Sequence, residues 1–141
     1  MEKVISILSK KQHSFHHVLP GATLRDALVR MTSESIDYLI VMDGDQFLGI
    51  LSEHDVTSKA MFNKKPIEKI TIKEVMNTGL PLVAANDTVE GCMRLMHHFN
   101  ARQLPVFDKF CFCGVISSDD ILQEVVYNRS GTLDNRQEPV L

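Results

Sequence analysis

The chain carries the same sequence pattern twice. Residues 23–56 align with residues 88–121 without a gap, at a constant offset of 65 residues (88 − 23). Identical residues occupy both copies at these pairs of positions: Thr23 and Thr88, Met31 and Met96, Leu39 and Leu104, Val41 and Val106, Asp43 and Asp108, Phe47 and Phe112, Gly49 and Gly114, Ser52 and Ser117, and Asp55 and Asp120. A repeat usually means that each unit cannot bury its apolar face alone and needs its neighbour. Two copies therefore predict a body with pseudo-twofold symmetry and paired clefts.

Composition argues against several classes of protein. The 141 residues are 44% hydrophobic and 23% charged, as in a globular protein with a sizeable core. The net charge of −3 argues against a nucleic-acid partner, and Lys10-Lys11 and Lys64-Lys65 are interpreted as solvated loop charge. No apolar run approaches the roughly 20 residues that cross a bilayer, and the N-terminus lacks a signal-peptide core, so no membrane partner is expected. An odd number of cysteines, 3, indicates a reducing compartment and hence a cytoplasmic protein.

The first copy predicts an alternation of strands and helices. Thr23, with Asp26 three residues later, is typical of a helix start, and apolar residues follow at helical spacing. The predicted elements are a short strand over residues 16–19, a helix from residue 23, strands over 37–42 and 47–51 joined by an Asp-Gly turn, and a helix from residue 52 to about 61.

The second copy repeats this order. Its predicted elements are a short strand over residues 80–84, a helix from 88, strands from 103 and over 112–116, and a helix from 117. The fold class is therefore α/β, more narrowly a layered α+β arrangement, with two β-α-β-β-α units packed sheet to sheet. The predicted boundaries are residues 1–64 for the first repeat, 65–129 for the second and 130–141 for a flexible tail.

Each copy ends its second strand with a Ser-x-x-Asp motif at a helix start. Ser52 and Asp55 follow Gly-Ile-Leu, and Ser117 and Asp120 follow Gly-Val-Ile. Such a motif often serves only to cap the helix, because the hydroxyl accepts from a backbone amide and the acid suits the helix dipole. A carboxylate can also accept both hydroxyls of a cis-diol, and a helix N-terminus suits phosphate. The residues alone leave both roles open.

The segments LIVMDGDQFLGILSEHDV and LPVFDKFCFCGVISSDDIL resemble the signature of the cystathionine beta-synthase (CBS) domain. The chain up to about residue 128 is similar to a tandem CBS pair, a Bateman module, of the bacterial or archaeal type that stands alone without a catalytic domain. The stretch ITIKEVM resembles the short lead-in helix of such pairs. The resemblance implies that adenosine-containing nucleotides (AMP, ADP, ATP or NAD(H)) bind as regulatory ligands in clefts between the repeats, with no other cofactor required.

The resemblance also implies a set of binding residues. Asp55 and Asp120 would accept from ribose hydroxyls, with Ser52 and Ser117 reaching ribose or phosphate. Gly49 and Gly114 would let the backbone approach the ligand closely. The walls and the base-reading backbone would come from Val18, Leu19, Ile40, Leu82, Val83, Gln103 and Pro105, with His17–Leu19 directed towards Asp120 and Leu80–Val83 towards Asp55. Core packing is the ordinary role for these apolar residues.

Arg102 distinguishes the two copies. By the same resemblance it faces the nucleotide phosphate, although an exposed arginine paired with a nearby acid is an equally ordinary reading. Asp37 holds the equivalent position in the first copy (102 − 65) and would repel a phosphate. We therefore expect unequal clefts, with the one that holds Asp120 and Arg102 favoured.

Metal and catalytic sites find little support. Adjacent histidines, at 16–17 and 97–98, do not face the same way on a helix, and the Cys111-x-Cys113 pair lacks a matching second cluster. No nucleophile elbow or Gly-rich phosphate loop is present.

Three functions follow from these patterns. The favoured hypothesis is a non-enzymatic sensor that passes nucleotide occupancy to an effector protein. The alternatives are a ligand-free interaction or dimerisation module, in which Ser-x-x-Asp only caps helices, and a nucleotide hydrolase. A homodimer of CBS pairs is also expected, with either a dimer-face or a core role for Leu24, Leu28, Met31, Met93 and Met96.

Overall fold

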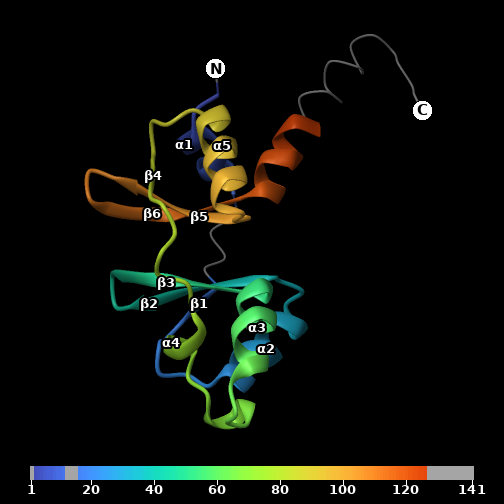
Figure 1. Ribbon diagram of the computed structural model, residues 1–141. Helices are drawn as coiled ribbons and strands as arrows, with labels where there is room; N and C mark the ends of the chain where they lie inside the picture. The colour runs from blue at the N-terminus through green and yellow to red at the C-terminus, as the bar shows by residue number, and fades with distance from the viewer. Residues whose placement is uncertain (1, 12–15, 127–141) are drawn as a thin grey trace, which may run out of the picture. The chain divides into compact units, whose positions relative to one another are not determined.

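A computed structural model of the protein describes residues 2–11 and 16–126 (Figure 1). The flexible tail predicted at residues 130–141 lies outside the described residues. The chain divides into two compact units that interleave along the sequence. The first-repeat unit spans residues 13–80, and the second-repeat unit combines residues 1–12 with residues 81–141.

The first-repeat unit has a three-stranded sheet of order β1-β2-β3, in which β1 and β2 are parallel and β2 and β3 antiparallel. Figure 1 shows its helices on one face of this sheet. Its elements are β1 (His17–Val18), α2 (Leu24–Ser33), β2 (Tyr38–Asp43), β3 (Gln46–Ser52), α3 (Glu53–Lys59), the 3₁₀ turns η1 (Ala60–Phe62) and η2 (Ile67–Lys69), and α4 (Ile72–Val75).

The second-repeat unit has the same architecture, with sheet order β4-β5-β6. Its elements are α1 (Val4–Lys10), β4 (Val83–Ala84), α5 (Val89–Phe99), β5 (Gln103–Asp108), β6 (Cys111–Ser117) and a helix over residues 118–126. The mixed α/β fold and the predicted order of strands and helices are confirmed. The expected sheet-to-sheet packing concerns the two units together and stays a prediction.

Side-chain caps begin the first long helix of each repeat. Oγ1 of Thr23 accepts from the backbone N–H of Asp26 at 3.1 Å, and Oγ1 of Thr88 accepts from that of Gly91 at 3.0 Å. Each bond satisfies a backbone donor that the helix cannot pair internally. The helix starts predicted at residues 23 and 88 are therefore confirmed.

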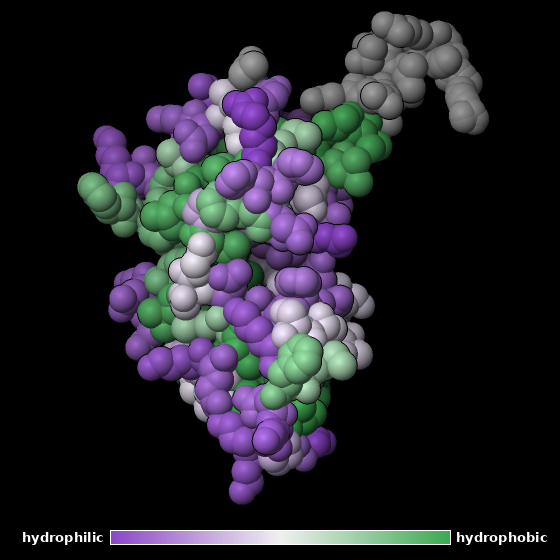
Figure 2. Space-filling model, viewed as in Figure 1, coloured by the Kyte–Doolittle hydropathy of each residue, from purple (hydrophilic) through white to green (hydrophobic). Residues whose placement is uncertain are grey.

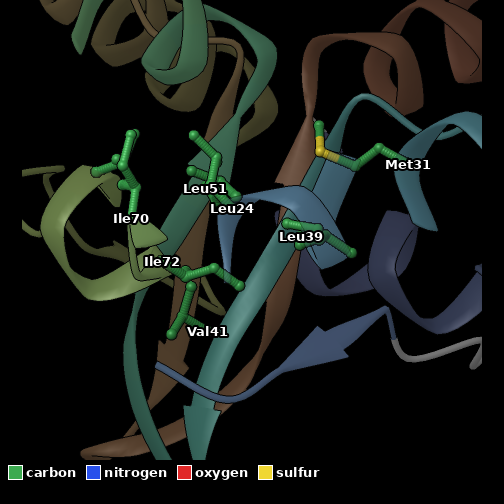
Figure 3. Packing of buried hydrophobic residues seen from close by; sticks show 9 residues of the cluster. Leu24, Met31, Leu39, Val41, Leu51, Ile70 and Ile72 are labelled. Carbon is green, nitrogen blue, oxygen red and sulfur yellow. The ribbon is translucent and has the colours of Figure 1, made fainter. Parts of the chain in front are cut away.

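The two cores are built from the same positions. In the first-repeat unit, α2, α4 and one face of β2 and β3 bury a contiguous cluster (Figure 3): Leu24, Ala27, Met31, Leu39, Val41, Leu51, Ile70, Ile72 and Val75. Adding 65 to the α2, β2 and β3 members gives residues that are also buried: Val89, Cys92, Met96, Leu104, Val106 and Ile116. The repeat in the sequence is thus a repeat of core positions, as expected when one apolar face per element drives packing.

Most residues considered for either the core or a dimer face belong to the core. Leu24, Met31 and Met96 are 0%, 4% and 7% exposed, so a role at a dimer face is wrong for them. Met93 is 49% exposed and retains that possibility. Figure 2 shows further apolar surface over the helix at residues 118–126, where these side chains are exposed: Leu122, Val125 and Val126.

Each repeat is completed by a lead-in segment, which we define as residues 2–11 and residues 70–77. The segment at residues 70–77 precedes the second repeat but packs on the first: Leu24 N–H donates to the Ile70 carbonyl (2.7 Å) and Ile72 N–H to that of Ala22 (2.9 Å). The segment at residues 2–11 precedes the first repeat but belongs to the second-repeat unit, with α1 taking the place of α4. The sequence analysis did not predict α1, whose seven residues have no side-chain cap.

Gly49 lies where β3 meets the lead-in segment at residues 70–77. Ile50 and Asn77 exchange two backbone hydrogen bonds, of 3.1 and 2.8 Å. A Cβ built on Gly49 would lie 2.7 Å from the Asn77 carbonyl oxygen, which is closer than side chains approach. The close approach that this glycine permits in the structure is therefore to the lead-in backbone. Gly114 has a φ of +150°, which favours glycine.

Gly49→Ala is expected to lower the free energy of unfolding by about 1–3 kcal/mol, because the new methyl group overpacks a backbone contact that cannot move aside cheaply. Gly21→Ala is the matched control, since a Cβ at Gly21 meets nothing within 4 Å and should change stability by less than about 0.5 kcal/mol. Urea denaturation measures both. Equal stabilities for the two variants would contradict the contact.

Glu74 forms a capping box at the start of α4. Its Oε2 accepts from the backbone N–H and the hydroxyl of Thr71, at 2.9 and 3.0 Å, and its Oε1 lies 2.6 Å from Nζ of Lys65. The hydrogen bond from Lys65, followed by those from Thr71, lowers the pKa of the Glu74 carboxyl from 4.5 to about 2. The ionised form is thus favoured in the folded state.

Stability from this depressed pKa is present above pH 4.5 and is lost as the pH falls towards 2. We expect Glu74→Gln to lower Tm at pH 7, with the difference from wild type narrowing over that range. The effect is small, because the Glu74 side chain is 35% exposed and solvent screens the pair. Glu68→Gln is the control, since Glu68 lies 3.9 Å from Arg25 and both side chains are exposed. Thermal denaturation at several pH values should show the narrowing for Glu74→Gln alone.

Every helix in the described ranges is too short or too polar to span a lipid bilayer.

Candidate functional site

Ser117 and Asp120 lie where β6 leads into the helix over residues 118–126. Oδ2 of Asp120 accepts from the backbone N–H of Ser117 at 2.8 Å, and Oγ of Ser117 accepts from the backbone N–H of Asp120 at 3.1 Å. This reciprocal pair is a capping box, so the capping role considered for the motif is present. The cap fixes the direction of the carboxylate. Its second oxygen, Oδ1, has no hydrogen bond or ion pair to any described residue.

Ser52 and Asp55 form the same capping box in the first repeat, but the acid is more fully engaged. Oδ2 of Asp55 accepts from both the backbone N–H and the hydroxyl of Ser52, each at 2.9 Å. Oδ1 lies 3.6 Å from Nζ of Lys59, one helical turn later. Asp55 is only 4% exposed, whereas Asp120 is half-buried. Of the two acids, Asp120 is therefore the more available to a ligand.

The β5–β6 ladder brings Arg102 and Gln103 to the Asp120 helix start. Gln103 pairs with Ser117 in register, and the N–H of Ser118 donates to the carbonyl of Arg102 at 2.8 Å. Gln103 is 7% exposed, and the Arg102 side chain is exposed. The guanidinium of Arg102 is thus carried on backbone that is hydrogen-bonded to this helix start.

Pro105 and Ile40 hold matching places in the two sheets. Pro105 pairs with Val115 and Ile40 with Ile50, and both residues are buried. Their backbone groups lie two residues along the strand from the ends nearest the helix starts. Reading of a base edge by these groups stays a prediction.

The short first strand of each repeat carries the remaining candidates. Val18 pairs with Val41 and is half-buried, and Val83 is fully buried. Leu19 and Leu82 are 62% and 61% exposed, so their apolar side chains are accessible to a ligand. The expected direction of these residues, towards the acid of the opposite repeat, stays a prediction.

Beside Val18, burial and the positive charge of Arg30 and His16 lower the pKa of His17 and favour its neutral form.

Lys10 and Lys11 occupy a position that the sequence analysis missed. Nζ of Lys11 lies 2.8 Å from Oδ2 of Asp120, and Nζ of Lys10 lies 2.9 Å from Oε2 of Glu124. Both lysines lie at the end of α1 and pair with acids, so their interpretation as loop charge is wrong, although the Lys10 side chain stays 56% exposed. The distance of more than 100 residues between the partners left no local signal; only the tertiary packing of α1 brings them together.

These charges border a hollow of about 410 Å³ within the second-repeat unit. Its lining consists of Ile7, Lys10, Lys11, Asp120, Gln123 and Glu124. A volume of this size is in the range of small-molecule sites. In the first-repeat unit a smaller hollow, of about 260 Å³, lies along α2 and α3 and does not include Asp55 among its lining residues.

The cysteine thiols differ in their exposure to solvent. Cys111 and Cys113 are exposed on β6, and burial followed by the nearby Asp108 raises the pKa of the Cys113 thiol. Burial, with a contribution from Asp87, raises the pKa of the Cys92 thiol to about 11, so this thiol stays protonated in the core. Within residues 2–11 and 16–126, no three metal-ligating side chains gather at one point.

Two regions of the chain match the model of one protein family. The family model of the CBS domain matches the chain twice, over residues 2–61 and residues 72–127. The chain belongs to the CBS-domain family. Both matches together make it a tandem CBS pair, as the two signature segments indicated.

Solved structures of CBS-domain proteins share this fold. One CBS-domain structure is 30% identical in sequence, with a TM-score of 0.83, and the match covers 89% of this chain and 99% of that chain. CBSX2 in complex with AMP is 18% identical, with a TM-score of 0.75, over 92% of this chain and 99% of that chain. At 18% identity the likeness concerns the fold alone.

A longer enzyme also contains a region similar to this CBS pair. Homoserine O-acetyltransferase of Methanococcus vannielii is 27% identical over 126 residues, which are 88% of this chain. The chain spans only 25% of the length of that relative.

The two capping acids are expected to differ in their contribution to stability. Asp55→Ala should lower the free energy of unfolding by about 1–2 kcal/mol, because it removes a buried acceptor that binds both the N–H and the hydroxyl of Ser52. Asp120→Ala should cost less, because the Asp120 side chain is half-buried and accepts only the N–H of Ser117 at this cap. The Asp→Asn variants keep an acceptor oxygen and serve as controls near wild type. Chemical denaturation of the four variants tests the order, and a larger loss for Asp120→Ala would contradict it.

Proposed function

We propose that this CBS pair is a regulatory module that binds an adenosine-containing nucleotide (AMP, ADP, ATP or NAD(H)) and passes its occupancy to a partner protein. The observation that carries the proposal is the Asp120 carboxylate, which is fixed by its cap and keeps Oδ1 without a partner among the described residues. A carboxylate oxygen held in this way can accept from the neighbouring hydroxyls of a ribose.

The position of Arg102 supports an anionic ligand at this helix start. Its backbone accepts from Ser118 beside Asp120, and its exposed guanidinium can swing towards a phosphate. In the first repeat, Glu53 N–H donates in the same way to the carbonyl of Asp37, at 3.1 Å, so an acid stands in place of the arginine. We therefore assign the nucleotide to the Asp120 site and expect weaker or no nucleotide binding at Asp55.

We further propose that the module is not itself an enzyme. A binding role asks only that the Asp120 carboxylate accept hydrogen bonds, which Oδ1 is placed to do. A cytoplasmic location and association into a homodimer are also part of this proposal. The exposed apolar side chains on α5 and on the helix over residues 118–126 suit association of this kind.

Isothermal titration calorimetry tests the proposal. AMP, ATP and NADH are titrated into wild type, Asp120→Asn and Asp55→Asn. We expect at least one nucleotide to bind wild type. Asp120→Asn should weaken that binding about tenfold or more, because it removes the charged acceptor for the ribose hydroxyls. Asp55→Asn should change the affinity little.

The absence of heat with every nucleotide would overturn the proposal. It would favour the alternative of a ligand-free interaction module, in which the two Ser-x-x-Asp motifs act only as caps. A larger loss for Asp55→Asn would move the site to the first repeat. Slow release of product from the bound nucleotide would instead indicate a hydrolase.

A further inference from the structure

The charges around Asp120 and Asp55 are arranged in opposite ways. Asp55 is paired by Lys59, which lies four residues later on the same helix. The equivalent of Lys59 in the second repeat is Glu124 (59 + 65), an acid. Two carboxylates one turn apart repel each other, so the second repeat needs cations from elsewhere.

The lead-in segment at residues 2–11 supplies these cations. Lys10 pairs with Glu124, and Lys11 pairs with Asp120 while it also donates to the carbonyl of Val115 at 2.9 Å. The lead-in segment of the first repeat offers no counterpart: Lys3 and Thr71 hold matching places (71 − 3 = 68), so Lys11 corresponds to Gly79 (11 + 68). A cation supplied to the capping acid by the lead-in segment is therefore particular to the second repeat.

Lys11 is placed to act on a ligand as well as on Asp120. Its side chain is 28% exposed, and it lines the hollow of about 410 Å³ together with the acid. A nucleotide whose ribose hydroxyls bind Asp120 carries its 5′-phosphate within a few ångströms of them, which is within reach of a four-carbon stem. A phosphate oxygen is a stronger acceptor for an ammonium group than the neutral carbonyl of Val115, so the exchange of one for the other is favourable.

We propose that Lys11 is a specificity-determining residue that selects ligands with a phosphate on the ribose over the free nucleoside. The inference rests on the proposed nucleotide site at Asp120 and adds a residue to it from outside the repeat. Lys10 is assigned no such role, because its partner is Glu124, one helical turn beyond Asp120. A lysine that only neutralised Asp120 would weaken the binding of AMP and adenosine alike, because it would compete with the ribose hydroxyls of every ligand.

Calorimetric titration with AMP and with adenosine separates these roles. We expect Lys11→Met to weaken AMP binding about tenfold or more and to change adenosine binding by less than about threefold, because only AMP loses a charged hydrogen bond. Lys11→Arg should keep most of the preference for AMP. Lys59→Met is the matched control, because it removes the cation beside Asp55 and should leave both affinities unchanged.

The ratio of the AMP and adenosine affinities decides the inference. A parallel gain in both would identify Lys11 as a competitor of the ribose, and a parallel loss in both would identify a structural role; either result overturns it. The Lys11→Arg variant covers the case in which Lys11→Met does not fold, since loss of the AMP preference in a folded Lys11→Arg protein would also overturn it. Wild type that binds neither AMP nor adenosine would overturn the inference, and the proposed function would fall with it only if ATP and NADH also give no heat.

Discussion

Backbone hydrogen bonds attach each lead-in segment to a helix start of the repeat that it completes. Val89 N–H donates to the carbonyl of Glu2 at 3.0 Å, and Val4 N–H donates to that of Asp87 at 2.9 Å. The matching bonds join residues 70–77 to the first repeat. They fix a short helix over the open end of each core, and Val4 and Ile72 are fully buried as a result. In the second-repeat unit the same attachment carries Lys10 and Lys11 to the helix start, so the candidate site depends on it.

Local patterns predicted the elements of the two repeats well. The Thr23 and Thr88 caps, the strand pairs and the turn between them all have signals within a few residues of each other. The structure adds that Leu39 and Leu104 hold the same core place, and that β2–β3 and β5–β6 shift register at the same point, after Val41 and after Val106. The exchange of lead-in segments had no such signal. Periodicity shows which face of α1 is apolar, but it does not say which repeat that face covers.

The residues of the candidate site that lie within the second repeat were predictable from the sequence. Ser117, Asp120 and the Arg102 backbone come together because they follow one another across the β5–β6 ladder, which the sequence pattern already indicates. Lys11 comes from a helix at the other end of the chain. The contrast between Lys59 and Glu124 was readable from the repeat alignment, and it is the signal that could have directed attention to a cation from elsewhere. When the charge changes sign between two otherwise matching positions, an ion-pair partner from outside the repeat is expected.

The interleaving of the units also limits how the chain can be divided. A fragment that ends at the repeat boundary near residue 64 would keep α1, whose partner strands it lacks, and would lose α4, which covers its own core. The complementary fragment would have the reverse defect. Neither fragment therefore contains a complete unit. The first-repeat unit is contiguous over residues 13–80, whereas the second-repeat unit draws on both residues 1–12 and residues 81–141. A cut at the edge of the sequence repeat thus divides both units, whereas cuts beside residues 13 and 80 would leave the first-repeat unit whole.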